Sequence, residues 1–246
     1  MFLAVDIGNT RIKIAVFDKN KIIKTFDYET LENERLYKHK FEEISTYFDI
    51  TDCAIISVVE GLEHKIKEAC DKVFGIKSLI LNTESSCEIK IAGSNPKSAG
   101  MDRLANVYAI INKPLPAIVV DIGTAITFDI LSANKEFLGG IIMPGVNMSL
   151  KSLAKGTSKL PEIKVQESPF AIGNRTETCI LSGVIRGTAS AIDGLLEQCI
   201  EELGECRTIV LTGGQAELVS KYMKFRSFLT EKDLTMVGIK NLYELC

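Results

Sequence analysis

The fold is decided by the stretch Ile118-Val119-Val120-Asp121-Ile122-Gly123-Thr124-Ala125-Ile126-Thr127-Phe128-Asp129-Ile130. It reads as two strands rich in β-branched and aromatic residues, joined by a tight polar turn. In the turn, Gly123 lets a ligand approach the backbone, and Thr124 offers a hydroxyl and a backbone N–H to an oxyanion. Asp121, at the end of a buried strand, is the kind of carboxylate that binds a metal ion or its waters. The stretch therefore predicts a hairpin whose turn binds phosphate and a cation.

The same pattern occurs at the N-terminus, where the sequence reads Phe2-Leu3-Ala4-Val5-Asp6-Ile7-Gly8-Asn9-Thr10. Apolar and polar residues then alternate, as the second strand of a hairpin should. Asp6 and Asp121 are separated by close to half of the 246-residue chain. We therefore predict two similar domains, residues 1–113 and 114–246, which face each other and offer two phosphate-binding turns to one cleft. The alternative is two ordinary hairpins that share a common tripeptide.

Composition and charge narrow the class of protein. Hydrophobic residues make up 46% of the chain, and the net charge is −3 with a sequence pI near 5.6, so a basic footprint for nucleic acid is missing. No apolar run approaches the ~18 residues that a membrane span needs. Seven scattered cysteines without a C-x-x-C pair and only two histidines argue against a zinc site. We expect a cytoplasmic protein with reduced thiols that binds neither nucleic acid nor a membrane.

Strand-like and helix-like stretches alternate along the chain, which indicates an α/β protein with some antiparallel hairpins. Beyond the two hairpins, strands are predicted at residues 22–28, 53–59, 78–81, 135–142 and 207–211. Helices are predicted at residues 31–48, 63–74, 104–111, 146–154, 176–203 and 215–222, with Gly75 ending the second of them. Residues 157–173 form a long loop, and a loop of this length in a compact domain is usually functional or mobile.

Two short segments carry further chemistry. Asp102 and Arg103 lie between a loop-like stretch and a predicted helix, so Asp102 is either a helix cap or a base presented to a substrate. Thr212-Gly213-Gly214 ends a predicted strand, where glycines let backbone and ligand approach each other. This segment is either a turn facing adenosine or phosphate, or a plain strand-to-helix turn.

Taken together, these motifs give the chain a resemblance to the type III pantothenate kinases, which belong to the superfamily of acetate and sugar kinases, heat-shock ATPases and actin. The resemblance covers nearly the whole chain, and Gly100-Met101-Asp102-Arg103 is its most family-specific segment. The other matching motifs are Asp6-Ile7-Gly8-Asn9-Thr10, Asn106, Asp121 to Asp129, Gly139-Gly140, Pro144-Gly145, Leu160-Pro161, Ile172-Gly173 with Thr176, Ser182-Gly183 and Thr212-Gly213-Gly214.

The resemblance implies two ribonuclease-H-like domains of the actin-like ATPase type, with the active site in the cleft between them. It implies ATP-dependent phosphorylation of the primary hydroxyl of pantothenate to 4'-phosphopantothenate, the first step of coenzyme A biosynthesis. It also implies Mg²⁺, a monovalent cation (K⁺ or NH₄⁺) and a homodimer. The remaining alternatives are a catalytically weak nucleotide-binding regulator on the same fold and a kinase for another small hydroxylated substrate.

The family's site residues map onto this sequence by motif. Asp102 matches the general base, and Asp121 matches the carboxylate that binds the monovalent cation. The predicted contacts to ATP are Asp6, Ile7, Gly8, Asn9, Thr10, Arg11, Ile12, Lys13 and Thr124. The predicted contacts to pantothenate are Gly100, Met101, Asp102, Arg103 and, from the partner subunit, Thr176. The chain departs from the family at Gly93, where members often have a tyrosine that lines the pantothenate pocket.

Overall fold

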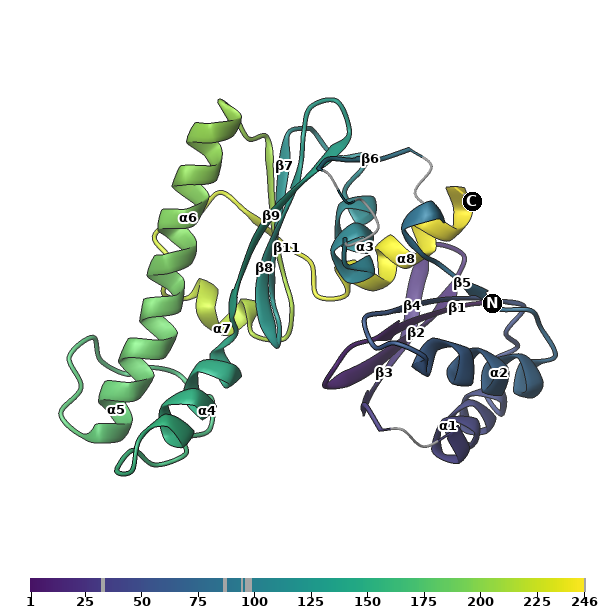
Figure 1. Ribbon diagram of the computed structural model, residues 1–246, viewed down its shortest axis with the longest axis horizontal. Coiled ribbons are helices and arrows are strands. Elements are labelled where there is room, and N and C mark those ends of the chain that lie inside the picture. The colour runs from purple at the N-terminus through teal and green to yellow at the C-terminus, as the bar shows by residue number, and fades with distance from the viewer. Residues whose placement is uncertain (32–33, 86–87, 94, 96–98, 246) are drawn as a thin grey trace. The chain divides into compact units, whose positions relative to one another are not determined.

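The computed structural model describes residues 1–31, 34–85, 88–93, 95 and 99–245 (Figure 1). The chain divides into two compact units. Unit 1 consists of Met1–Ile111 together with Leu234–Cys246, and unit 2 consists of Asn112–Asp233.

Unit 1 is built on a five-stranded sheet with the strand order β3-β2-β1-β4-β5. The first three strands are antiparallel neighbours, whereas β4 runs parallel to β1 and β5 runs parallel to β4. The strands are β1 (Phe2–Ile7), β2 (Arg11–Asp18), β3 (Lys21–Glu29), β4 (Asp52–Ser57) and β5 (Leu79–Ile80). Two short elements follow in the chain, η1 (Thr83–Ser85) and β6 (Lys90–Ile91). The predicted first hairpin is confirmed as β1–β2.

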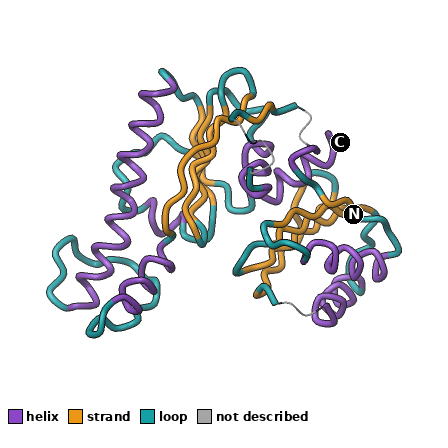
Figure 2. Tube along the Cα trace, viewed as in Figure 1, coloured by secondary structure: helices purple, strands orange, loops and turns teal. Residues whose placement is uncertain are grey.

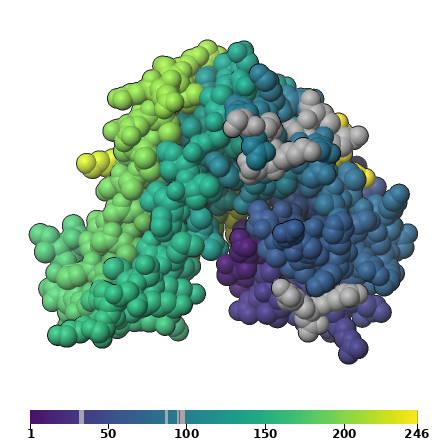
Figure 3. Space-filling model, viewed as in Figure 1, coloured from purple at the N-terminus to yellow at the C-terminus, as the bar shows by residue number. Residues whose placement is uncertain are grey.

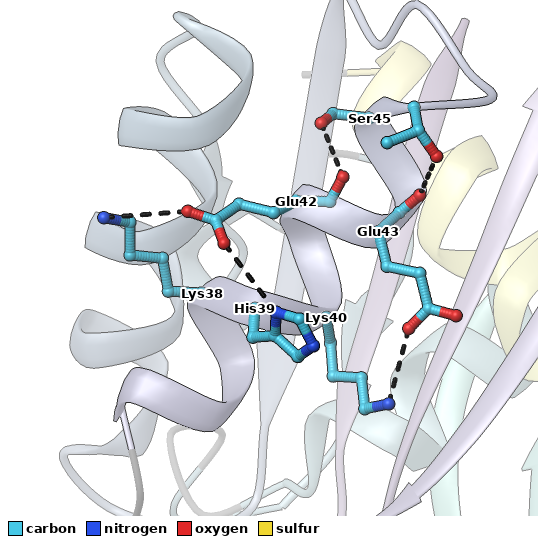
Figure 4. A network of polar contacts seen from close by, with 7 residues as sticks. Lys38, His39, Lys40, Glu42, Glu43 and Ser45 are labelled. Atoms are coloured by element: carbon cyan, nitrogen blue, oxygen red, sulfur yellow. Dashed lines mark hydrogen bonds and ion pairs between the residues drawn. The ribbon is translucent and has the colours of Figure 1, made fainter.

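Helices α1 (Glu34–Ser45) and α2 (Leu62–Phe74) belong to the core of unit 1. Tyr37, Phe41 and Ile44 of α1 are buried with the inward residues of the sheet, which explains the apolar stripe in the sequence. The polar face of α1 is exposed, and its ion pairs include Lys38 with Glu42 and Lys40 with Glu43 (Figure 4). Such exposed pairs contribute little to stability. As predicted, α2 ends at Gly75, whose φ of 68° is left-handed.

The last helix, α8 (Leu234–Leu245), packs against α3 (Met101–Ala109) of unit 1. A Cβ on Gly238 would lie 1.7 Å from the carbonyl oxygen of Ala105, so only glycine allows this approach. Thr235 Oγ1 donates to Asn106 Oδ1 at 2.8 Å, and Asn241 Nδ2 donates to the Tyr108 carbonyl oxygen at 3.1 Å. The predicted division into residues 1–113 and 114–246 differs from the compact units here, because α8 buries its apolar face against unit 1.

Unit 2 contains a sheet in which the strands β11-β10-β7-β8-β9 are successive neighbours. Strands β7, β8 and β9 are antiparallel neighbours, whereas β10 is parallel to β7 and β11 is parallel to β10. The strands are β7 (Ala117–Ile122), β8 (Ala125–Leu131), β9 (Glu136–Pro144), β10 (Thr208–Thr212) and β11 (Leu229–Thr230). The helical segments are α4 (Val146–Gly156), α5 (Thr176–Leu181), η3 (Ser182–Arg186, a π-helix), α6 (Gly187–Leu203) and α7 (Ala216–Ser220).

The two sheets repeat one topology, which confirms the duplication in the sequence. The order β3-β2-β1-β4-β5 in unit 1 matches β9-β8-β7-β10-β11 in unit 2, with the same sequence of antiparallel and parallel pairs. Strands β1 and β7 also share one burial pattern, in which the aspartate is the only half-buried residue of six. Asp6 and Asp121 therefore occupy equivalent positions near the ends of equivalent strands.

The continuous helical stretch Thr176–Leu203 covers one side of the sheet in unit 2 (Figure 2). Among the described residues it is the one helix that is long and apolar enough, by length and composition, to cross a membrane. Half of its most apolar window is nevertheless buried inside the protein. Ile185, Ile192 and Leu196 pack in one cluster with residues of β7 and β8, so its apolar side chains serve the core of unit 2.

Candidate active site

The turn between β1 and β2 is tight and leaves its tip exposed. The Gly8 N–H donates to the Arg11 carbonyl oxygen at 2.9 Å, and Thr30 Oγ1 donates to the Gly8 carbonyl oxygen at 2.7 Å. Asn9 and Thr10 are exposed at the tip. Asp6 is half-buried and lies opposite Lys13 in the strand register. These residues form one contiguous polar turn, as the sequence predicted.

Three of the predicted ATP contacts in this hairpin are engaged in packing or in an ion pair within unit 1. Ile7 and Ile12 are buried in the core of unit 1 and pair with each other across β1 and β2, so neither offers an exposed surface to a ligand. The guanidinium of Arg11 pairs with Asp27 at 2.6 Å, and this hydrogen bond raises the pKa of Arg11. The Arg11 side chain is thus engaged by a carboxylate of the same sheet.

The equivalent turn in unit 2 is enclosed by a neighbouring chain segment. The Gly123 N–H donates to the Ala125 carbonyl oxygen at 3.1 Å, and the Gly145 N–H donates to the Thr124 carbonyl oxygen at 3.2 Å. A Cβ on Gly145 would lie 2.3 Å from the Thr124 oxygen, so the junction of β9 and α4 requires glycine. Thr124 itself is exposed. This contact has no residue-level signal in the sequence, because it joins positions that local patterns do not connect.

The segment Thr212-Gly213-Gly214 lies directly against Asp121. A Cβ on Gly213 would lie 2.4 Å from Asp121 Oδ1 and 2.6 Å from the Ile122 nitrogen, and the φ of Gly213 is +93°. The Gln215 N–H donates to the Ile122 carbonyl oxygen at 3.0 Å. A Cβ on Gly214 would meet nothing within 4 Å. Gly213 is therefore needed for packing on Asp121, while Gly214 leaves open space that a ligand could use.

Asp102 occupies the first turn of α3. The N-cap of this helix is Gly100, and Asp102 Oδ1 accepts a hydrogen bond from the Arg103 N–H at 2.8 Å. Asp102 is therefore not the cap, although its carboxylate satisfies one N–H of the first turn and benefits from the helix dipole. Asp102 and Arg103 are half-buried, whereas Met101 is buried.

A cavity of about 410 Å³ in unit 1 adjoins Gly100 and Met101. Its walls include Ser57, Val58 and Glu63. Glu63 Oε2 is buried and has no hydrogen-bond partner. Ser57 and Val58 are predicted only as part of a strand and Glu63 only as part of a helix, so the sequence does not indicate this wall of the cavity. The cavity gives the segment Gly100 to Arg103 a concave neighbour of the size that small-molecule sites have.

Thr176 is the first residue of α5 and is exposed. The preceding backbone is fixed by Thr178, whose Oγ1 accepts from the N–H groups of Asn174 and Arg175 at 3.2 and 3.1 Å. Residues 157–175 contain no regular element, which confirms the loop predicted at 157–173, and they lie at the surface of unit 2 (Figure 3). They are nevertheless held to the core by Leu160, Ile163 and Val165.

The described residues include no group of three or more His, Cys, Asp or Glu side chains that could hold a metal ion. Each turn instead offers one aspartate together with backbone carbonyl oxygens. Oxygen donors of this kind suit Mg²⁺ and K⁺ better than softer metals. A cation would thus be held by Asp6 or Asp121 with backbone and ligand oxygens. The donor chemistry therefore fits a hard divalent cation such as Mg²⁺.

Comparison with known protein families identifies a family whose sequence profile matches most of this chain. The sequence profile of the type III pantothenate kinases matches residues 2–198. A type III pantothenate kinase from Persephonella marina is 33% identical over 252 residues, which cover 99% of this chain and 98% of the relative.

Solved structures show the same fold. A Baf-family protein from Campylobacter jejuni has a TM-score of 0.61 at 24% identity, covering 98% of this chain and 97% of that one. A ROK family glucokinase from Streptomyces griseus, in complex with glucose and AMPPNP, has a TM-score of 0.56 at 13% identity and covers 98% of each chain. The predicted fold class, α/β with actin-like ATPase domains, is confirmed.

Proposed function

Because the chain belongs to the type III pantothenate kinase family, we propose that it transfers the γ-phosphoryl group of ATP to the primary hydroxyl of pantothenate. The product, 4'-phosphopantothenate, enters coenzyme A biosynthesis. The observation that carries the proposal is a family match that includes both Asp-x-Gly turns and the segment Gly100 to Arg103.

The two turns supply what phosphoryl transfer needs most, which is positioning and charge neutralisation. Backbone N–H groups of Asn9 and Thr10 and the hydroxyl of Thr124 would hold the phosphates, while the Gly8 N–H closes the turn on the Arg11 carbonyl oxygen. Asp6 would hold Mg²⁺, which neutralises charge on the transferred group when bound. The exposure of Asn9, Thr10 and Thr124 supports this assignment.

Asp102 is proposed as the general base. Its carboxylate stands in the first turn of α3, beside the cavity that adjoins Gly100 and Met101. From there it would accept the proton of the substrate hydroxyl as that oxygen attacks phosphorus. Arg103 would hold a substrate oxygen or orient the carboxylate. The role requires that the carboxylate come within hydrogen-bond reach of that hydroxyl.

Asp121 is proposed to bind the monovalent cation, K⁺ or NH₄⁺. The close packing of Gly213 on its carboxylate would fix one oxygen ligand in place. We further propose that the enzyme is a cytoplasmic homodimer and that Thr176 reaches pantothenate from the partner subunit. Thr176 is exposed, which supports a contact with a substrate bound to the other subunit.

The test is ADP release from ATP and Mg²⁺, with and without pantothenate, in potassium and in sodium buffer. We expect release that requires both pantothenate and potassium. ADP release without pantothenate would point to an ATPase or another acceptor, and no release in either buffer would favour the regulator.

The role of Asp102 is tested with Asp102→Asn in the same assay. A general base typically contributes about 10²- to 10⁴-fold, so turnover should fall by that factor while ATP binding stays nearly intact. Asp18→Asn, at the exposed last residue of β2, is the control and should keep wild-type turnover. Near-normal turnover of Asp102→Asn would remove Asp102 from the role.

A further inference from the structure

Residues 168–175 fold back along the helical stretch that begins at Thr176. Ser168 is 2% exposed although it lies in an irregular surface segment. Its burial is explained by two side chains from elsewhere in unit 2, Arg186 at the end of η3 and Tyr222 just after α7. We refer to Ser168, Arg186 and Tyr222 as the anchor cluster.

Arg186 and Tyr222 form hydrogen bonds with the N–H, the Oγ and the carbonyl oxygen of Ser168. The Ser168 N–H donates to Tyr222 Oη at 2.9 Å, and Tyr222 Oη lies 3.1 Å from the Ser168 carbonyl oxygen, to which it donates. Arg186 donates from Nε to Ser168 Oγ at 3.1 Å and from Nη2 to the Ser168 carbonyl oxygen at 3.0 Å. The guanidinium carbon of Arg186 also lies 4.6 Å from the centre of the Tyr222 ring, a cation–π contact. So many bonds to one residue fix the start of the segment.

Further contacts continue the fixation as far as Thr176. Ser182 Oγ donates to the Ala171 carbonyl oxygen at 2.6 Å. A Cβ on Gly173 would lie 2.4 Å from the Cys179 nitrogen, so the backbone rests directly on α5 at this point. Thr178 then holds Asn174 and Arg175 as described above. The segment is thus attached at successive points to the helical stretch that it precedes.

The π-helical segment η3 supplies two of these attachments. Ser182 and Arg186 are its first and last residues. Positions four apart in a helix lie on the same face, so both side chains reach the same covering segment. π-Helical segments are rare, and those that occur inside α-helices frequently mark functional sites. In this protein the one in η3 presents both donors to residues 168–175.

We propose that Ser168, Arg186 and Tyr222 are positioning residues that hold Thr176 in place for pantothenate. This inference rests on the proposed function and on the proposed contact of Thr176 with the substrate. The cluster does not touch the reacting atoms; it removes the freedom of residues 168–175, so that Thr176 is already in place when the substrate binds. The exposed apolar side chains of Phe170 and Ile172 show that burial of the segment's own apolar residues does not hold it.

Tyr222→Phe is the most selective variant, because it keeps the ring beneath Arg186 and removes only the hydroxyl. We expect the KM for pantothenate to rise about two- to tenfold, the range for one or two lost neutral hydrogen bonds. The KM for ATP and kcat should stay within about twofold, because a contact made equally in ground and transition states affects KM alone. Lys221→Met is the matched control, since it removes only the exposed ion pair with Glu167 beside the cluster.

A second variant separates positioning from a general structural role. In a Thr176→Ala background, Tyr222→Phe should raise the KM for pantothenate no further, because the contact through which it acts is already lost. Amide hydrogen exchange of residues 168–175 should accelerate in Tyr222→Phe, while exchange in α6 stays as in the wild type.

Several results would overturn the inference. One is an unchanged KM for pantothenate in Tyr222→Phe. Another is a general defect in this variant, with a lower kcat, higher KM values for both substrates and a lower Tm. The third is an effect of Tyr222→Phe on the KM for pantothenate that is as large in the Thr176→Ala background as in the wild type. If the wild-type protein itself releases no ADP with pantothenate, the proposed function fails first and the inference fails with it. Wild-type activity with a silent Tyr222→Phe would refute the inference alone.

Discussion

Replacement of Gly238 by alanine tests how α3 and its Asp102 are held in place. The Cβ of an alanine would lie 1.7 Å from the Ala105 carbonyl oxygen and 2.4 Å from its carbonyl carbon, whereas ordinary contacts are 3.4–4 Å. Both sides of this contact are backbone, so rotation of a side chain cannot relieve it. Helices α3 and α8 would therefore have to separate by about 1.7 Å at this point.

The magnitude follows from three contributions. Ala gains about 1 kcal/mol over Gly in a helix interior. Overpacking costs about 1–3 kcal/mol, and often more where backbone must move. Separation also weakens the Thr235–Asn106 and Asn241–Tyr108 hydrogen bonds, each worth about 0.5–1.5 kcal/mol. The net expectation is a destabilisation of about 3 kcal/mol, or a Tm lower by about 6–12 °C for a chain of this size.

The assay is thermal unfolding together with pantothenate-dependent ADP release. Gly194→Ala in α6 is the control, because a Cβ there meets nothing within 4 Å. We expect its Tm to stay the same or rise, since the helix-propensity gain is not offset by a clash. A Gly238→Ala protein with wild-type Tm and activity would refute the reasoning, because it would mean that α8 does not pack on α3 as closely as the structure has it.

Two further substitutions test other parts of the structure. Gly213→Ala places a Cβ 2.4 Å from Asp121 Oδ1 at a φ of +93°. We therefore expect the free energy of unfolding to fall by about 1–3 kcal/mol and the potassium concentration for half-maximal activity to rise. Gly214→Ala is the control and should keep the wild-type Tm, because a Cβ there meets nothing within 4 Å. Burial alone would raise the pKa of Asp71, but hydrogen bonds from Lys67 and from the Ser78 N–H outweigh it and lower this pKa. The ionised Asp71 carboxylate therefore stabilises the folded state at pH values above its ordinary pKa, and this stabilisation is lost as the pH falls through the lowered pKa of the folded state. The Tm of Asp71→Asn should accordingly be below the wild-type Tm at pH 6 and approach the wild-type Tm below about pH 4. An equal Tm difference at both pH values would contradict this sign.

The hairpins and their turns could be predicted from the sequence because their signals are local. The alternation around Ile12 and Ile14 and the repeated Asp-x-Gly segments are contained in short windows, and the structure has both hairpins. Gly75 was predicted as a helix end for the same reason, since a left-handed C-cap depends on one residue.

The placement of α8 and the burial of Ser168 could not be predicted in this way. Glycine is a poor helix former, so Gly238 in the middle of a helix has no local explanation. Glycine is required there because the backbone of Ala105, more than 130 positions earlier in the chain, lies against it. Ser168 is a small polar residue in a stretch without periodicity, so nothing local indicates that Arg186 and Tyr222 bury it. The roles of Asp102, Asp121 and Thr176 remain predictions, which the substitutions above test.

The residues proposed to act on the substrates share one kind of support. Gly213 packs on Asp121, Gly145 packs on the turn that holds Thr124, and Gly238 lets α8 reach the helix that carries Asp102. In each case the backbone of a glycine approaches its neighbour more closely than any Cβ would permit. Close backbone contact leaves the supported segment few alternative positions, which is what a preorganised site requires. It follows that adding a single methyl group at any of these three glycines should impair activity more than removing polar atoms from an exposed face, such as the ion pairs of α1.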